Sequence, residues 1–328
     1  MLLLNKEDIK KVFSMKETIE AVKRSFVFYS EGKSESPLRT NIQVKKHDGA
    51  LLFMPAYVED ADYASLKIVD VFPRNIDKGI PSIFSQVVLI DGKTGSIVAI
   101  LDGAYVTQLR TGAASGVAFD KLARKDAKIG ALIGTGGQAA TQLEAMMSVR
   151  NLELVKVYDY VPERLNDFVN IMTKELAAYD TKIIAASTSD EALEDADLLV
   201  TVTPSNKPVF DASKCKAGIT VSCVGSYQPH MQEMDPHILT RASKIYFDSK
   251  SAVLEEAGDI LIPLNNGLIT ENDFTGEIGD VLSDKIIGRE NDEEIIVFKT
   301  VGIGVQDLMT AKAIYEKSID AGIGAEWN

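Results

Sequence analysis

The stretch KIGALIGTGGQAATQ, residues 128–142, decides the fold that the sequence predicts. Its apolar residues 129–133 are long enough for one buried strand, and Gly134, Gly136 and Gly137 separate that strand from a run that favours a helix. A glycine turn at such a place lets backbone N–H groups approach a pyrophosphate, and the helix N-terminus adds a favourable dipole. The stretch therefore predicts a dinucleotide-binding turn of the form G-x-G-x-x-A.

An acidic residue about 20 positions beyond the glycines strengthens this prediction. Residues 154–158 (LVKVY) favour a second strand, and Asp159 follows directly. A carboxylate at the tip of that strand can accept hydrogen bonds from the ribose hydroxyls of an adenosine and repels a 2′-phosphate. Because Tyr160 and no arginine comes next, we expect NAD(H) as the cofactor; the sequence leaves NADP(H) open.

Strands and helices alternate through the middle of the chain. This alternation predicts a Rossmann-type, doubly wound parallel sheet in residues 125–304, with helix and loop expected from about residue 248 to 300. Residues 1–124 combine helical periodicity with strands and hairpin turns, which predicts a smaller α+β domain. The apolar stripe of a final helix needs a partner, so residues 305–328 should pack back onto this first domain. The fold class is thus α/β.

Composition limits the function classes. A chain of 328 residues exceeds the size at which a single core usually stops growing, about 250–300 residues. Its formal net charge of −13 makes it a poor candidate for binding nucleic acid or an anionic membrane. No apolar segment has the length of a spanning helix or the features of a signal peptide. Cys215 and Cys223 are too few for a disulfide framework and predict no metal site, so we expect a cytoplasmic protein.

Three basic residues of the first domain stand at places unusual for surface charges. Lys67 interrupts an apolar strand, Arg110 precedes a run of small residues, and Arg39 begins a strand after Pro37. Each of them could also be a solvated or salt-bridged structural residue. A substrate carboxylate would need such cations, and burial can lower the pKa of a lysine into the range that suits proton transfer.

Loops at the carboxyl ends of the predicted parallel strands supply further candidates, because such loops line the ligand crevice of a doubly wound sheet. Thr203 ends one of these strands, and Gly225 and Ser226 follow another. Glu256 lies in a predicted helix that could border the same crevice, and it could equally be a solvated helical acid.

Taken together, these motifs resemble the ornithine cyclodeaminase/mu-crystallin family over nearly the whole chain. The resemblance implies a homodimer and an NAD(P)-dependent reaction at the Cα–N bond of a small amino or imino acid. The matching pieces are PLR at 37–39, LK at 66–67, DGAYVTQLRTGAAS at 102–115, IGTGGQ at 133–138, Asp159, VGSYQPHMQE at 224–233 and TVGIGVQD at 300–307.

The resemblance also implies roles for individual residues. Arg39, Lys67 and Arg110 would surround the substrate carboxylate and the reacting centre, with Lys67 protonated near an imine nitrogen. Ser226 would orient the substrate or a water, and Glu256 is a second candidate proton donor. The residues expected to contact the dinucleotide are Ser82, Arg110, Thr111, Gly134, Gly136, Gly137, Gln138, Asp159, Thr203, Gly225, Ser226 and Thr300.

One departure from the cyclodeaminases bears on the reaction. Ser226 stands where those enzymes carry an aspartate, and a serine cannot act as the carboxylate base. We therefore expect reduction of a cyclic ketimine, such as Δ1-pyrroline-2-carboxylate to L-proline. The alternatives are cyclodeamination of L-ornithine to proline and ammonia, an L-alanine-type amino acid dehydrogenase, and an NAD(P)H-binding protein without catalysis.

Overall fold

The computed structural model describes residues 1–327, and its chain divides into two compact units. Unit 1 consists of Met1–Arg110 and Ile303–Asn328, of which residue 328 lies outside the described residues; unit 2 is Thr111–Gly302. The chain passes from unit 1 to unit 2 within helix α3 (Gly103–Leu122) and returns shortly after strand β15 (Ile296–Lys299). In residues 1–327 no helix has the length and apolar character needed to cross a lipid bilayer.

Unit 1 is built on a largely antiparallel sheet with strand order β16-β1-β7-β6-β5-β4-β2, in which β3 pairs with β4. Strand β1 joins β7 in parallel, whereas β4 to β7 are antiparallel neighbours in chain order. The hairpin turns that the sequence predicted at residues 47–49 and 92–95 connect β3 with β4 and β6 with β7. The strands are β1 (Leu2–Leu4), β2 (Ser34–Glu35), β3 (Thr40–Val44), β4 (Gly49–Val58), β5 (Tyr63–Val71), β6 (Ile83–Asp91), β7 (Ile97–Asp102) and β16 (Ala325–Glu326).

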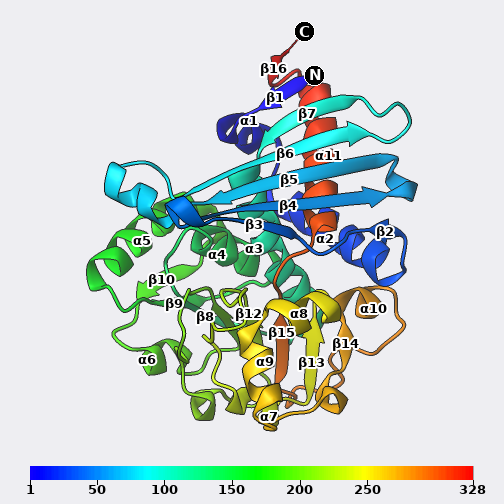
Figure 1. Ribbon diagram of the computed structural model, residues 1–328. Coiled ribbons are helices and arrows are strands. Elements are labelled where there is room, and N and C mark those ends of the chain that lie inside the picture. The colour runs from blue at the N-terminus through cyan, green and yellow to red at the C-terminus, as the bar shows by residue number, and fades with distance from the viewer. Residues whose placement is uncertain (328) are drawn as a thin grey trace. The chain divides into compact units, whose positions relative to one another are not determined.

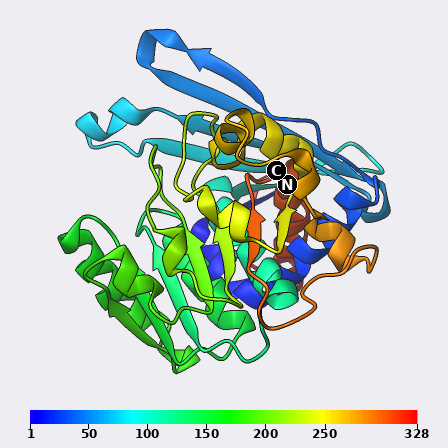
Figure 2. The ribbon, with the colours of Figure 1, turned by 90° about the horizontal axis from the view of Figure 1, so that it is seen from below.

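Three helices complete unit 1: α1 (Lys6–Val12), α2 (Met15–Ser30) and α11 (Gly304–Ala321). Helix α2 begins at a capping box formed by Ser14 and Glu17. Helix α11, red in Figure 1, contacts α1 and α2 and runs along β4, β5 and β6. The last helix of the chain therefore returns to the N-terminal sheet, where its apolar face is covered. Figure 2 shows the same unit from below, with the long β3–β4 hairpin in blue.

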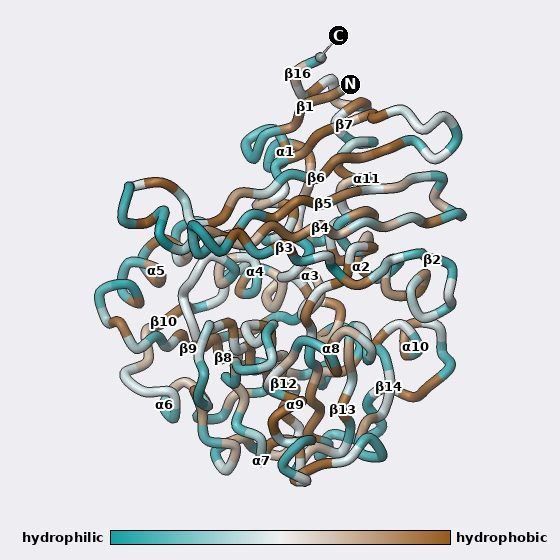
Figure 3. The backbone as a smooth tube through the Cα atoms, in the orientation of Figure 1, coloured by the Kyte–Doolittle hydropathy of each residue, from teal (hydrophilic) through white to brown (hydrophobic). Residues whose placement is uncertain are grey.

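Unit 2 contains a parallel sheet with strand order β10-β9-β8-β11-β12-β15-β13-β14. The order reverses at β8, between β9 and β11, which is the switch point at which doubly wound sheets bind ligands. In Figure 3, which is coloured by hydropathy, β15 carries three hydrophobic residues before Lys299, in keeping with its burial. The strands before β15 are β8 (Ile129–Ile133), β9 (Leu154–Tyr158), β10 (Lys182–Ala185), β11 (Leu198–Thr201), β12 (Thr220–Cys223), β13 (Lys244–Phe247) and β14 (Gly276–Glu277).

The helices of unit 2 connect these strands. Helices α3 and α4 approach each other closely, because a Cβ added to Gly112 would lie 2.4 Å from the carbonyl oxygen of Thr141. The small residues after Arg110 therefore permit a close approach of the two backbones. The helices after α3 are α4 (Ala139–Val149), α5 (Pro162–Glu175), α6 (Ser189–Leu193), α7 (His237–Arg241), α8 (Lys250–Glu256), α9 (Gly258–Asn265) and α10 (Ile278–Leu282).

The expectation of helix and loop throughout residues 248–300 is wrong at two places. Residues 276–277 form the short edge strand β14, which pairs with β13. Residues 296–299 (IVFK) form β15, which lies between β12 and β13 and is fully buried. A run of four residues that ends in a lysine and follows an acidic stretch is too short to show strand periodicity. Its place in the sheet depends on neighbours that are distant in the sequence.

Candidate functional site

A cavity of about 630 Å³ in unit 2 lies at the carboxyl ends of β8, β9 and β11. It is lined by residues of the β8–α4 turn (133–136), the tip of β9 (158–160), Arg164 and the segment that follows β11 (202–205). This volume is in the range of small-molecule and cofactor sites, about 300–1,000 Å³. The cavity therefore lies where the sequence predicts the dinucleotide.

The glycine turn has two distinct parts. Gly134 has φ +103°, and a Cβ there would lie 2.8 Å from the carbonyl oxygen of Val202, so only glycine fits. Gly136 and Gly137 are exposed, and an added Cβ would meet nothing within 4 Å. At the adjoining start of α4, Oε1 of Gln138 is buried and accepts no hydrogen bond from the described residues. The open turn before a helix N-terminus thus fits a pyrophosphate.

Asp159 is almost completely buried and fully hydrogen-bonded. Its Oδ2 accepts from the N–H and the hydroxyl of Thr135, at 2.9 and 2.7 Å, and its Oδ1 accepts from the N–H of Val161 at 3.0 Å. Arg164 donates to both oxygens, at 2.6 and 2.8 Å. Burial raises the pKa of this carboxyl group, but these hydrogen bonds outweigh burial and hold the pKa below its usual value. Asp159 is therefore ionised, and its contact with a ribose stays a prediction.

Sequence reasoning missed Arg164, because only the position next to Asp159 was considered. Arg164 lies in the first turn of α5, five residues after the acid, and its guanidinium is 5.5 Å from the ring centroid of Tyr160. A cation one helical turn beyond a strand tip was the signal that could have identified it.

The loops after β11 and β12 meet at one carboxylate. The N–H and the hydroxyl of Thr203 donate to Glu233 at 2.6 and 2.9 Å, and the N–H of Gly225 donates to the same side chain at 2.6 Å. The structure therefore brings Thr203 and Gly225 together, although the sequence offered no sign of Glu233 as their partner.

Ser226 and Thr300 use their hydroxyl groups inside unit 2. The hydroxyl of Ser226 donates to the carbonyl oxygen of Met231 at 2.8 Å and accepts from the N–H of Asp259 at 3.3 Å. The hydroxyl of Thr300 donates to Asp248 at 2.6 Å. Both side chains are buried. Their proposed contacts with substrate or cofactor stay predictions.

Three further predicted residues have less specific surroundings. The carbonyl oxygen of Thr111 accepts a hydrogen bond from the side chain of Gln142, which ties α3 to α4. Glu256 is the last residue of α8 and is half-buried. Ser82 lies in unit 1 just before β6, and its carbonyl oxygen accepts from the N–H of Phe72. Their roles toward a ligand stay predictions.

Unit 1 contains a buried cluster of two cations and one acid. Lys67 on β5 donates to Oδ2 of Asp307 at 2.6 Å, and Nε of Arg110 donates to Oδ1 of the same carboxylate at 3.2 Å. Arg110 also donates to the side-chain oxygen of Gln306 at 3.2 Å. Lys67, Arg110 and Asp307 are 1%, 6% and 0% exposed, so this ion-pair network is shielded from water.

The cluster gives Lys67 an unusual proton affinity. Burial lowers its pKa from 10.5 to about 7; the charge of Asp307 opposes this shift, whereas the positive charges of Arg110 and Arg39 add to it. The structure thus brings together the three cations that the sequence singled out, with Arg39 half-buried. A lysine that titrates near neutral pH can both hold and release a proton.

Asp307 is the residue of the unit 1 cluster that sequence reasoning missed. The acid was treated only as the start of the last helix, within TVGIGVQD. A charged residue on the apolar face of a helix is seldom buried without a partner, and that placement was the available signal. Among residues 1–327 no group of three or more His, Cys, Asp or Glu side chains could hold a metal ion.

Comparisons with known proteins agree with this architecture. The family model described as "Ornithine cyclodeaminase/mu-crystallin family" matches residues 1–322. A Δ1-pyrroline-2-carboxylate reductase of Bacillus cereus is 36% identical over 324 residues, which cover 99% of this chain and 98% of that protein.

The solved structures that are similar over the full chain include the following two. The Δ1-pyrroline-2-carboxylate reductase of Thermococcus litoralis, in complex with NADH and L-proline, has a TM-score of 0.94 at 41% identity and covers 100% of both chains. An archaeal alanine dehydrogenase, described as a dimer with bound NAD, has a TM-score of 0.91 at 35% identity and covers 100% of this chain and 99% of its own. The predicted family and α/β fold class are confirmed.

We predict that Asp307→Asn destabilises the protein more at pH 6 than at pH 9. The native pKa of Lys67, about 7, lies below the ordinary 10.5, so the unfolded state binds more protons between these values and the contribution of Lys67 to stability rises with pH. Without Asp307 the pKa of Lys67 falls further, so at pH 6 the folded variant must give up the proton that the wild-type protein keeps, which costs about 1.4 kcal/mol. At pH 9 Lys67 is already neutral in both proteins.

The measurement is the free energy of unfolding at both pH values, without ligand. Glu316→Gln is the matched control, since Glu316 lies on the same helix but forms an exposed ion pair with Lys312. A loss of stability in Asp307→Asn that did not depend on pH would contradict the assigned proton affinity of Lys67.

Proposed function

This chain belongs to the ornithine cyclodeaminase/mu-crystallin family, and we propose that it is an NAD(H)-dependent reductase of that family which acts on cyclic ketimines. The proposed reaction converts Δ1-pyrroline-2-carboxylate, or a close analogue, into L-proline. The observation that carries the proposal is the buried cluster of Lys67 and Arg110 around Asp307, with its lysine that titrates near pH 7. The similarity to reductases with this substrate supports it.

Residues 134–138 and Asp159 would hold the dinucleotide, which when bound supplies a hydride to the substrate Cα. Arg39 and Arg110 would bind the substrate carboxylate, because planar guanidinium groups match its geometry. The bonds of Arg110 to Asp307 and Gln306 orient its guanidinium, whose remaining N–H groups can face a ligand. The cluster therefore serves both to bind the substrate and to orient it.

Lys67 would manage the proton. Reduction of a C=N bond adds a hydride to carbon and a proton to nitrogen, so an ammonium group beside the imine nitrogen completes the balance and becomes a neutral amine. Its carboxylate partner Asp307 would keep enough of the ammonium form at neutral pH. Substrate orientation by Ser226 and proton donation by Glu256 remain proposals for the same site.

An amino acid dehydrogenase is the second candidate. The archaeal alanine dehydrogenase is 35% identical to this chain, and a carboxylate clamp with a proton-donating lysine would also serve an open-chain imino acid. Ornithine cyclodeamination is less well supported, because Ser226 cannot supply a carboxylate base. Binding of NAD(P)H without catalysis would leave the buried cation cluster unexplained.

We also propose a homodimer in the cytoplasm. Unit 1 exposes six large apolar side chains in segments 38–42 and 76–84, and such surface often marks an interface. These residues are Leu38, Ile42, Ile76, Ile80, Ile83 and Phe84. Cys215 and Cys223 are free and buried, which suits a reducing compartment.

The dimer predicts a mass in light scattering of twice the 35.7 kDa of one chain. Replacing Ile42 and Ile83 together by Asp should shift this mass toward the monomer, because two charges would be buried in the interface. Ile171→Asp is the control, as Ile171 is exposed on α5 of unit 2. A wild-type protein that is monomeric at micromolar concentration would refute the proposal.

The substrate assignment predicts that, in a panel assayed with NADH and NADPH, Δ1-pyrroline-2-carboxylate gives a higher kcat/KM than pyruvate with ammonium. L-Proline should accumulate as NADH is consumed. The opposite ranking would favour the dehydrogenase. Ammonia and proline formed from L-ornithine and NAD⁺ without net NADH would indicate a cyclodeaminase, and binding of NADH without any turnover would exclude catalysis.

Lys67→Ala should lower kcat by about 10²–10⁴-fold, the usual contribution of a positioned proton donor, and leave the Kd for NADH largely unchanged. In the wild-type protein the reduction rate should fall as the pH rises through about 7, where Lys67 loses its proton. Lys67→Arg keeps the charge but does not release a proton, so this descending limb should disappear. Unimpaired turnover in Lys67→Ala would refute the assignment.

A further inference from the structure

The side chain of Glu233 joins two loops at the carboxyl ends of β11 and β12. Its Oε1 accepts from the N–H groups of Val224 and Gly225, at 3.2 and 2.6 Å. Its Oε2 accepts from the N–H and the hydroxyl of Thr203, at 2.6 and 2.9 Å. Glu233 is fully buried. One carboxylate thus accepts hydrogen bonds from four donor groups in two loops. These loops follow adjacent strands of the sheet, although Thr203 and Val224 are 21 residues apart in sequence.

The main chain beside Glu233 supports the same wall of the dinucleotide cavity. The N–H of Val209 donates to the carbonyl oxygen of Glu233 at 2.9 Å, and the N–H of Gln232 donates to that of Ser205 at 3.0 Å. Thr203, Ser205 and Val209 all line the cavity. The segment around Glu233 therefore holds this wall at both ends.

The two loops are in direct contact. A Cβ added to Gly225 would lie 2.0 Å from the carbonyl oxygen of Thr203 and 2.7 Å from Oε2 of Glu233. No larger residue fits at this position without moving one of the loops. Glycine at position 225 thus allows the two loops to touch. The spacing of the loops depends on the carboxylate of Glu233, which bridges them.

Glu233 is itself held by a buried ion pair. Oδ1 of Asp259 accepts from the N–H groups of Glu233 and Met234, at 2.8 and 2.9 Å, and its Oδ2 accepts from Nζ of Lys299 at 3.0 Å. Asp259 and Lys299 are 0% exposed. Burial lowers the pKa of Lys299, but the charges of Asp259 and Glu233 outweigh burial and raise it. Lys299 therefore remains an ammonium between the acids.

Apolar side chains could often replace such a buried charged group without loss of stability. What they could not supply is four directed hydrogen bonds to two loops. We propose that Glu233 is a positioning residue for the dinucleotide: its carboxylate, supported by Asp259 and Lys299, sets the spacing of the Thr203 and Gly225 loops and thereby the affinity for NADH. The inference rests on the proposed function, since it concerns the cofactor site of that reductase.

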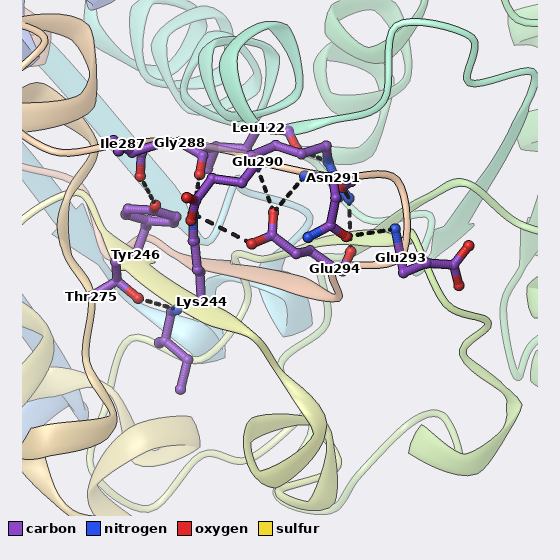
Figure 4. A network of polar contacts seen from close by, with 12 residues as sticks. Leu122, Lys244, Tyr246, Thr275, Ile287, Gly288, Glu290, Asn291, Glu293 and Glu294 are labelled. Atoms are coloured by element: carbon purple, nitrogen blue, oxygen red, sulfur yellow. Dashed lines mark hydrogen bonds and ion pairs between the residues drawn. The ribbon is translucent and has the colours of Figure 1, made fainter.

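The opposite end of the sheet offers a matched control. Figure 4 shows Glu294 in a network near the amino ends of β13 and β15. Glu294 is 8% exposed and accepts from the N–H groups of Glu290 and Asn291, at 2.8 and 3.4 Å, with Lys244 at 3.4 Å. It is also a buried carboxylate bonded to backbone N–H groups beside a lysine, and none of these residues lines the dinucleotide cavity.

The test compares Glu233→Gln with Glu294→Gln. A glutamine at 233 can offer oxygen to one loop, while its NH₂ group faces the N–H groups of the other and leaves them unsatisfied. We expect the Kd for NADH, measured by fluorescence titration of the protein, to rise about tenfold or more in Glu233→Gln. In Glu294→Gln it should stay at the wild-type value. Both variants should unfold at a lower temperature.

Steady-state kinetics supply a second readout. In Glu233→Gln the KM for NADH should rise, whereas kcat at saturating NADH should change little, because Lys67 and Arg110 belong to unit 1. A purely structural role would lower thermal stability in both variants and leave NADH affinity equal. That result would overturn the inference.

If Glu233→Gln does not fold, Thr203→Val tests the same contact more mildly, since it removes the hydroxyl bond and keeps the N–H bond. A Kd for NADH unchanged in Thr203→Val would then overturn the inference. Wild-type protein that does not bind NADH would instead refute the proposed function. Wild-type binding together with unaltered binding by Glu233→Gln would refute only the role of Glu233.

Discussion

The carboxylate of Asp307 is the interaction on which unit 1 depends. It meets Lys67 across 240 positions of sequence and Arg110 across 197. Without it, two positive charges would be buried together in low-dielectric surroundings, each at a cost of several kcal/mol. The shared acid therefore explains why the last helix returns to the N-terminal sheet, and why a lysine and an arginine can be buried side by side. The same contact opposes the effect of burial on the pKa of Lys67, so Asp307 contributes both to folding and to the proton affinity of this lysine.

Buried acidic residues have different roles at the amino and the carboxyl ends of the strands of unit 2. At the amino ends of β13 and β15, Glu294 and Lys244 close a network that joins the segments flanking these strands. At the carboxyl ends, Glu233 and Asp159 bind loops that line the 630 Å³ cavity, for which we propose the dinucleotide. The chemistry is alike, a carboxylate that accepts backbone N–H groups, but only the carboxyl ends of parallel strands carry the loops that vary with function. Location in the sheet thus distinguishes a stabilising acid from one that shapes a site.

The sequence predicted what local physics determines. The strand before Gly134, the helix after it and Asp159 follow from hydrophobic period and from a backbone conformation that only glycine adopts. Lys67 was recognisable because an apolar strand surrounded it. Asp307 and Glu233 were missed because their partners are distant in sequence, 240 residues for Lys67 and 30 for Thr203, and the local sign of Asp307 was only an acid on the apolar face of a helix. Strand β15 was missed for the same reason, as four residues become a central strand only through the two strands beside them. Arg164 was missed because only the position next to Asp159 was considered.

The position of Ser226 links this packing to the choice of reaction. Its hydroxyl donates to the carbonyl oxygen of Met231 and accepts from the N–H of Asp259, so the site needs a group that does both. An ionised carboxylate only accepts hydrogen bonds and would be repelled by that carbonyl oxygen. The aspartate that cyclodeaminases are expected to carry here would also join a region that already holds Asp259 and Glu233. The hydroxyl of Ser226 therefore stabilises the loop that contains Gly225. A protein with serine at this position is suited to hydride transfer without a carboxylate base there.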